Sequence, residues 1–286
     1  AGYCIIVIEH RLDVVLPFVD KVFHVGNRNV NEITDRENYL KEQSTEIEDT
    51  CSTFSGTLPA FSLADVAFAV KARDILNGVT SDILKGSRTV LLGENGCGKT
   101  TLLRLISRLE KPTRGVILQN IDDKFGQKSK QSKKWYKKVG VVYQNPDYQL
   151  FMQTVEKEIK FGAKSDEYAD EIAEKFGIKH LYARHPQSLS EGQKRRVSIA
   201  AVVATDPEVL ILDEPTVGQD YKGLCEMVEV LNKLHEEAHN TMITVTHDKR
   251  CAAALCDKSV WIKNGKTYKT GGKELVDEFF IQIGVN

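Results

Sequence analysis

The sequence predicts an α/β protein whose sheet is mostly parallel, because short apolar runs alternate along the chain with stretches of helical spacing. A glycine-rich loop between one such run and the next helical stretch is a further sign of this class. Residues 154–182 repeat apolar side chains every three to four positions, and residues 194–204 (KRRVSIAAVVA) continue as a helix. The expected strands are FSLADVAFAV, SRTVLLG, KKVGVVYQ, EVLILDE and TMITVTH.

The composition is that of an ordinary soluble globular protein. The 286 residues carry a net charge of −1, with 41% hydrophobic and 28% charged residues. This balance argues against a nucleic-acid or acidic-lipid surface, and we expect neither a membrane span nor a signal peptide. The cysteines lack CxxC pairs and metal spacing, so we expect reduced thiols at Cys4, Cys51, Cys97, Cys225, Cys251 and Cys256.

Two segments precede the main domain. Residues 1–26 have a strand–helix–strand pattern in CIIVIEH, RLDVVLPF and DKVFHVG. Residues 27–57 are polar and acidic with turn formers at their end, which predicts a linker.

The first of these segments repeats a later part of the chain. Ten residues separate His10 from Asp20, and ten separate His247 from Asp257; an apolar run precedes each histidine and a lysine follows each aspartate. This internal repeat predicts that the N-terminal segment is the end of a preceding domain of the same kind. The alternative is a chance match between two short amphipathic segments.

Residues 124–138 (KFGQKSKQSKKWYKK) are rich in lysine and include Trp135 and Tyr136. Such a run is compatible with a nucleic-acid patch, or with a solvated loop and short helix ahead of the next strand. We favour the loop and helix, because the rest of the chain is balanced in charge.

The strand, loop and helix in TVLLGENGCGKTT match the pattern Gly93-x4-Gly98-Lys99-Thr100. Backbone N–H groups of such a loop surround nucleotide phosphates at a helix N-terminus, and glycines permit the close approach. Lys99 would then reach the β- and γ-phosphates, and the Thr100 hydroxyl would bind Mg²⁺.

Two further strand ends carry polar residues that suit this loop. Asp213 and Glu214 follow the apolar run VLIL, at the carboxyl edge where open α/β sheets bind ligands. Asp213 would hold Mg²⁺ through water, and Glu214 would activate the attacking water. His247 ends MITVTH and would stabilise the γ-phosphate, although a histidine there is more often structural when it stands alone.

The run LSEGQKRR at 189–196 resembles LSGGQ, the signature of ATP-binding cassette (ABC) ATPases. The resemblance covers about residues 58–275, with Gln144 matching the Q-loop, Gly218-Gln219-Asp220 the D-loop and His247 the switch histidine. It implies a phosphate-loop NTPase of ABC type over 58–286, with an antiparallel β subdomain and an inserted helical subdomain at about 147–205.

The resemblance also implies a dimer in which each ATP lies between one cassette's phosphate loop and the other's signature. Glu214, His247 and Gln144 would be catalytic, and Thr100, Gln144 and Asp213 would hold Mg²⁺. Ser190 would in addition cap the signature helix. The implied nucleotide contacts are Gly93, Glu94, Asn95, Gly96, Cys97, Gly98, Lys99, Thr100, Thr101, Ser190, Gly192, Gln193 and Asp220.

A narrower resemblance concerns QNPDYQLFMQTVEKEIKFG, which is similar to energy-coupling-factor ATPases that drive uptake of vitamins and of cobalt or nickel ions. LSEGQKRRVSIA and DEPTVGQD resemble the duplicated, two-cassette members, so residues 1–26 would be the remnant of a preceding cassette. Asp147, Tyr148 and Gln149 would then lie near the groove for a membrane partner, unless they merely cover the sheet.

This resemblance implies an importer ATPase at the cytoplasmic face of the cell membrane. Its partners would be a second cassette (a missing first half or a second copy), a transmembrane coupling subunit and a substrate-binding membrane subunit, with no nucleic acid. The alternative is a soluble tandem ATPase acting on ribosomes or nucleic acid; the short acidic linker argues against it. The presence of Glu214 and His247 disfavours a non-catalytic nucleotide-binding module.

Three positions depart from the family pattern. Val70, with Phe68 two residues before it, stands where an aromatic residue usually stacks on adenine, so base stacking is expected to be weak or supplied differently. Glu191 replaces a glycine of the signature and would add a negative charge near a partner's ATP. Cys97 lies inside the phosphate loop, where we favour an inert thiol.

Overall fold

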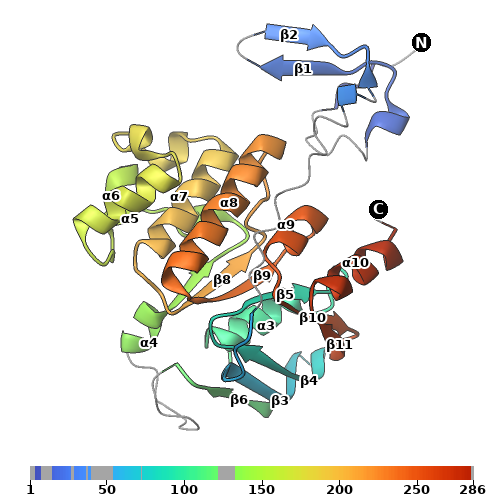
Figure 1. The fold of residues 1–286 in the computed structure, drawn as a ribbon, viewed down its shortest axis with the longest axis vertical. Coiled ribbons are helices and arrows are strands. Elements are labelled where there is room, and N and C mark those ends of the chain that lie inside the picture. Colours follow the sequence, from blue (N-terminus) through green and yellow to red (C-terminus); the bar gives the residue numbers. More distant parts are fainter. Residues whose placement is uncertain are drawn as a thin grey trace.

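The computed structural model describes residues 4–7, 15–26, 29–36, 38–39, 54–71, 73–121 and 133–284. Its centre is a six-stranded sheet in the order β11-β10-β5-β9-β8-β7 (Figure 1). All neighbouring pairs are parallel except β10 with β11, which confirms the mostly parallel sheet. The strands are β5 (Arg88–Leu92), β7 (Val139–Val142), β8 (Val209–Asp213), β9 (Thr241–Val245), β10 (Lys258–Lys263) and β11 (Lys266–Gly271).

Both faces of this sheet are covered, which explains its continuous apolar runs. In β8, Val209 and Ile211 pack into one hydrophobic cluster, whereas Leu210 and Leu212 pack into another. Successive side chains of a strand point to opposite faces, so an unbroken apolar run is the pattern of a strand buried on both sides. The strand therefore carries its last residue, Asp213, to a well-fixed position at the sheet edge.

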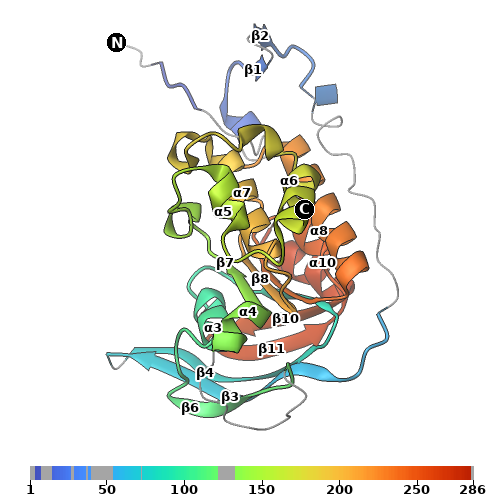
Figure 2. The ribbon, with the colours of Figure 1, turned by 90° about the vertical axis from the view of Figure 1, so that its left-hand side faces the viewer.

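A second, antiparallel sheet has the order β4-β3-β6, from β3 (Pro59–Val70), β4 (Arg73–Leu84) and β6 (Arg114–Gln119). Helix α3 (Lys99–Ile106) contributes Leu102, Leu105 and Ile106 to the cluster shared by the two sheets. Figure 2 shows the antiparallel sheet as a separate layer below α3. This layer is the antiparallel β subdomain that the family resemblance implies.

The helices expected within 154–182 and at 194–204 are confirmed, and they lie between β7 and β8 in the chain. They lie on the side of the parallel sheet away from the antiparallel sheet (Figure 2). In the lysine-rich segment α4 lies directly before β7, while residues 122–132 are outside the described residues. The helices are α4 (Lys133–Lys138), α5 (Val155–Lys160), α6 (Asp166–Lys175), α7 (Glu191–Val203), α8 (Tyr221–Ala238), α9 (Lys249–Ala254) and α10 (Lys273–Gln282), with 3-10 turns η2 (Pro146–Tyr148), η3 (Lys179–Leu181) and η4 (Pro186–Ser188).

The prediction of a strand at the start of the chain is wrong for residues 4–7, the part of that run that the structure describes. Residues 4–7 have no regular secondary structure, and the side chains of Ile5 and Ile6 are more than four-fifths exposed. A strand needs a neighbour for its backbone hydrogen bonds, and no neighbour pairs with this run among the described residues. The described structure in this region is a 3-10 turn, η1 (Leu16–Phe18), and a hairpin of β1 (Phe23–Gly26) and β2 (Asn29–Glu32).

The hairpin extends into the segment expected to be a linker, and His10 lies outside the described residues. The two aspartates of the sequence repeat differ in their surroundings. Asp257 is 3% exposed and pairs with Arg88 of β5 at 2.7 Å, whereas Asp20 is exposed. The origin of residues 1–26 as a cassette remnant stays a prediction. No helix in the described parts of the chain is long and apolar enough to cross a membrane.

Candidate nucleotide site

A cavity of about 1160 Å³ lies at the carboxyl edge of the parallel strands. It is lined by the phosphate loop after β5, by Gln144 after β7, by Asp213 and Glu214 at the end of β8, and by His247 after β9. Because β5, β9, β8 and β7 are neighbours in the sheet, their carboxyl ends converge on one place. The structure thus brings together residues that are more than 150 positions apart in the chain.

The phosphate loop has a backbone that only glycine adopts without strain. Gly93 and Gly98 have φ angles of +152° and +107°. A Cβ on Gly93 would lie 2.5 Å from the carbonyl oxygen of Ile262, and one on Gly98 would lie 2.5 Å from Leu76. Gly98 is also the N-cap of α3, so the loop leads directly into a helix N-terminus, where backbone N–H groups suit an anion.

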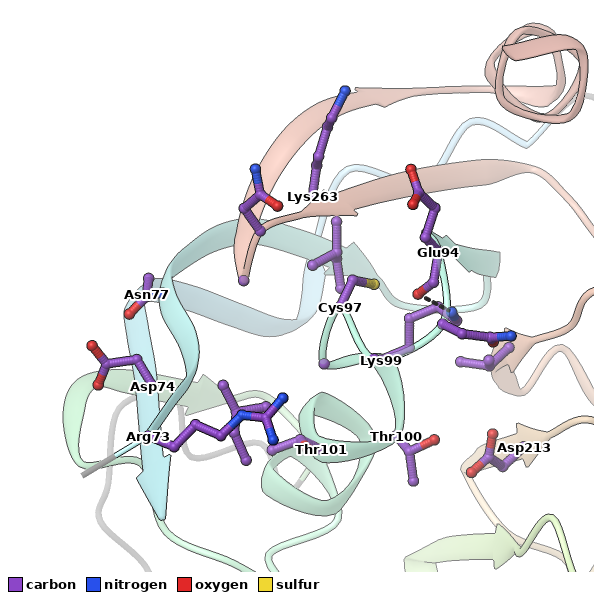
Figure 3. A pocket seen from close by; sticks show the side chains of 18 of the residues that line it. Arg73, Asp74, Asn77, Glu94, Cys97, Lys99, Thr100, Thr101, Asp213 and Lys263 are labelled. Carbon is purple, nitrogen blue, oxygen red and sulfur yellow. Dashed lines mark hydrogen bonds between the residues drawn. The ribbon is translucent and has the colours of Figure 1, made fainter. Parts of the chain in front are cut away.

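Lys99 is 7% exposed, and its ammonium group lies within the loop (Figure 3). Its Nζ donates to the carbonyl oxygens of Gly93 (2.6 Å) and Glu94 (3.0 Å), which uses two of its three protons. Burial lowers the pKa of Lys99, although the nearby carboxylates of Asp213 and Glu214 act in the opposite direction. The arrangement fixes a cation inside the loop that is expected to surround phosphate.

The side chains of Thr100 and Asp213 face each other across the cavity floor (Figure 3). Burial raises the pKa of Asp213, and a hydrogen bond from Thr100 acts against that rise. A hydroxyl and a carboxylate in this position are oxygen donors of the kind that Mg²⁺ takes together with phosphate oxygens. The donor set therefore fits the magnesium site predicted for Thr100, Asp213 and the neighbouring Gln144.

Glu214 is held in an unusual conformation for a non-glycine residue, with φ +55°. Its N–H donates to the Val245 carbonyl (2.8 Å), and its Oε2 accepts from the His247 N–H (3.2 Å). Its Oε1 is buried and has no hydrogen-bond partner within the described chain. Burial raises the pKa of Glu214 to about 7, since the His247 N–H offsets only part of that effect. A strained, buried carboxylate with a pKa near neutrality is typical of a general base.

His247 and Glu214 also meet through their side chains. The imidazole Nε2 lies 3.5 Å from Glu214 Oε1 and is about two-fifths exposed toward the cavity. A ring in that position can interact with a group bound in front of Glu214.

Besides Gly93 of the phosphate loop, whose carbonyl accepts from Lys99, four of the predicted nucleotide contacts do not line this cavity. Ser190 caps α7 in a capping box with Gln193, as expected from the sequence, and Asp220 caps α8 by accepting from the Gly223 N–H (2.7 Å). Gly192 packs against the D-loop, where Gln219 donates to its carbonyl (2.8 Å). These four residues therefore lie on a part of the chain separate from the cavity, and their predicted contact with a partner's nucleotide stays a prediction.

The cavity also contains residues that sequence reasoning missed. Arg73, Asp74 and Asn77 come from β4, and Lys263 ends β10 (Figure 3). Asn264 follows in the turn between β10 and β11. They reach the cavity through contacts between segments that are distant in the chain, such as the hydrogen bond from the Asn77 N–H to the Gly265 carbonyl (2.7 Å), so no local motif could have identified them. Val70 lines the same cavity and is 45% exposed; its place next to the adenine base stays a prediction.

Comparison with known proteins agrees with this geometry. The ABC transporter family profile matches residues 76–217. The energy-coupling factor transporter ATP-binding protein EcfA2 of Bacillus subtilis is 40% identical over 206 residues, covering 68% of this chain and 75% of that protein. EcfA2 of Enterococcus faecalis is 41% identical over 210 residues, covering 68% and 71%.

Two solved structures share the fold. CbiO1 from Clostridium perfringens, described as part of the ABC transporter complex CbiONQ, has a TM-score of 0.68 and 32% identity, covering 78% of this chain and 92% of that one. The ATP-binding cassette MJ0796, solved as a dimer bound to ADP and phosphate, has a TM-score of 0.65 and 26% identity, covering 74% and 98%. The chain belongs to the ABC transporter family, is an ABC ATPase, and has energy-coupling factor ATP-binding proteins among its relatives.

Proposed function

We propose that this chain binds MgATP in the described cavity and hydrolyses it to power import through membrane partners. The observation that carries the proposal is the convergence of Lys99, Thr100, Asp213, Glu214 and His247 on one cavity. A cation, a metal-ligand pair, a base and a histidine are the parts that phosphoryl transfer to water needs.

Each residue has a distinct role in this proposal. The backbone of the loop and Lys99 hold the phosphates, while Thr100, Asp213 and Gln144 would hold Mg²⁺. The metal, when bound, neutralises charge on the β- and γ-phosphates. Glu214 accepts the proton of the attacking water through Oε1, which has no hydrogen-bond partner among the described residues, and His247 contacts the γ-phosphate.

A second cassette completes the site. The surface formed by Ser190, Gly192, Gln193 and Asp220 lies outside the cavity, so a partner's copy of it would close over the bound nucleotide. The solved MJ0796 dimer supports such a pairing for a related cassette. The partner is a second copy of this chain or a related cassette, and the negative charge of Glu191 would face its nucleotide.

The membrane partner is proposed to dock on an aromatic surface made of Tyr148, Phe151 and Phe161. These side chains are 79%, 66% and 58% exposed, and the rings of Phe151 and Phe161 pack edge to face with centroids 5.3 Å apart. Exposed aromatic clusters suit the apolar face of a partner helix. Buried Glu158 fixes this surface by accepting from the N–H groups of Phe151 (2.9 Å) and Met152 (2.7 Å).

Affinity purification from detergent-solubilised membranes of the cells that make the protein tests this proposal. We expect an integral membrane protein to be retained in stoichiometric amount, and to be lost with Phe151→Asp. Tyr268→Asp is the matched control, since Tyr268 is also exposed (57%) but lies on β11, at the opposite edge of the sheet from β7. Retention of ribosomal proteins in place of a membrane protein would show that the import proposal is wrong.

A further inference from the structure

The signature helix α7 carries three consecutive basic residues that contact three different segments. Lys194 Nζ donates to Asp147 Oδ1 (2.8 Å) in η2, and Arg196 Nη2 pairs with Glu226 (2.7 Å) on α8. Arg195, between them, donates from Nη1 to the carbonyl oxygen of Tyr143 (2.6 Å) and from Nη2 to that of Gln144. Lys194 and Arg196 form ordinary ion pairs at partly exposed sites, whereas Arg195 bonds to backbone.

Arg195 is among the most buried side chains of the molecule, with 1% exposure. Within the described chain it forms no ion pair, and its Nε has no hydrogen-bond partner. A buried cation is costly unless it is well bonded, and here the bonds are two carbonyl oxygens of one short segment. The guanidinium is thus committed to the backbone of the segment that carries Gln144.

The same segment is held from its other side. Gln149 accepts from the Tyr143 N–H at Oε1 (2.9 Å) and donates to the Val141 carbonyl (2.7 Å). Gln149 therefore fixes the N–H of Tyr143. Arg195 binds the carbonyl oxygens of Tyr143 and Gln144, and so fixes the peptide units on both sides of the Gln144 Cα. Gln144 itself is exposed and lines the cavity. Backbone orientation at residue 144 decides where its side-chain amide points.

We propose that Arg195 is a positioning residue for Gln144. By holding the Gln144 backbone to the signature helix, it sets the distance of the Gln144 amide from the metal and γ-phosphate end of the cavity. The position of the helix that carries this chain's own signature thereby influences nucleotide binding in this chain's own cavity. This inference rests on the proposed function, because it assumes that Gln144 contacts the γ-phosphate end of MgATP.

The test compares MgATP with MgADP, which lacks the γ-phosphate. Affinities are measured by calorimetry in the Glu214→Gln background, so that ATP is not consumed. For Arg195→Met we expect MgATP affinity to fall about tenfold and MgADP affinity to change less than about twofold. Arg195→Lys keeps the charge and one bond, so it should lose less MgATP affinity than Arg195→Met.

Two controls separate positioning from general destabilisation. Arg88→Lys alters another arginine with 1% exposure, on β5, whose partners are Asp257 and Asn232. It should lower the unfolding midpoint without changing the ratio of MgATP to MgADP affinity. In a Gln144→Ala background, Arg195→Lys should leave MgATP affinity unchanged within about twofold, because its effect passes through the Gln144 side chain.

The outcomes are distinguishable from a failure of the proposed function. If the Glu214→Gln background protein binds neither nucleotide, the proposed function is wrong. If it binds MgATP, but the Arg195 variants lower both affinities equally, lower neither, or act additively with Gln144→Ala, the positioning inference alone is wrong.

Discussion

The catalytic role assigned to Glu214 is tested most directly by removing its proton-accepting carboxylate and by following its ionisation with pH. Its carboxylate is buried, its Oε1 has no hydrogen-bond partner in the described part of the chain, and burial raises its pKa to about 7. Replacing it with Gln keeps the shape but removes the proton acceptor. We expect Glu214→Gln to lower kcat by about 10²–10⁴-fold, the usual contribution of a general base, which corresponds to about 3–5.5 kcal/mol of barrier.

The raised pKa of Glu214 also predicts how strongly the rate of hydrolysis depends on pH. A base acts only in its ionised form, and with a pKa of about 7 roughly a tenth of Glu214 is ionised at pH 6 and about nine-tenths at pH 8. The ratio kcat/KM for MgATP, which reports the free enzyme, should therefore rise nearly tenfold between these pH values. An ordinary exposed glutamate would be fully ionised over the whole range and would give a flat profile.

The assay is phosphate release at MgATP concentrations well below KM, from pH 6 to 8. MgATP affinity measured over the same range corrects for any change in binding, and Glu229→Gln on the surface of α8 serves as a matched control. The reasoning is refuted if the corrected profile is flat, or if Glu214→Gln keeps more than about a tenth of the wild-type kcat.

Three further predictions concern binding and stability. Lys99→Ala should abolish measurable nucleotide binding, because it removes the buried cation of the phosphate loop; unchanged ATP affinity in a fluorescence titration would contradict the site. Asp257→Asn should lower the free energy of unfolding in urea at pH 7 by about 3 kcal/mol, since it leaves the Arg88 guanidinium buried without its counter-charge. Burial acts to raise the pKa of Asp257, but the bonds from Arg88 outweigh it and hold this pKa below its ordinary value. The ion pair therefore stabilises the fold at pH values above the ordinary pKa, and this stabilisation is lost as pH falls through the folded-state pKa. A urea midpoint equal to that of the wild type in the variant would contradict this prediction. Val70→Tyr should tighten ATP binding about two- to tenfold by adding an aromatic ring at the cavity rim, and an unchanged affinity would mean that the base lies elsewhere.

The sequence predicted those parts of the molecule that local patterns determine. The strands buried on both faces, the phosphate loop and the carboxylates after β8 all lie within short, strongly patterned stretches. For residues 4–7 the predicted N-terminal strand was wrong, because an apolar run forms a strand only beside a partner strand, and none pairs with it in the described structure. Strand β4 was missed because its exposed and buried residues do not alternate strictly, and Arg73 and Asn77 were missed with it. Arg195 could not have been identified, since its partners are backbone carbonyls that lie 51 and 52 residues earlier in the chain.

The hydrogen bond between residue 247 and Glu214 has a consequence for how the site can change over generations. The donor at 3.2 Å is the peptide N–H of His247, so any amino acid except proline at this position supplies it. Mutation of His247 to another residue except proline would remove the imidazole but keep the hydrogen bond from the backbone N–H to the Glu214 carboxylate. Descendants of this gene can therefore vary the side chain at 247, and with it the rate of hydrolysis, while inheriting Glu214 in the same position. Evolution can thus change the side chain at position 247 without moving Glu214, whereas replacing Glu214 removes the carboxylate itself.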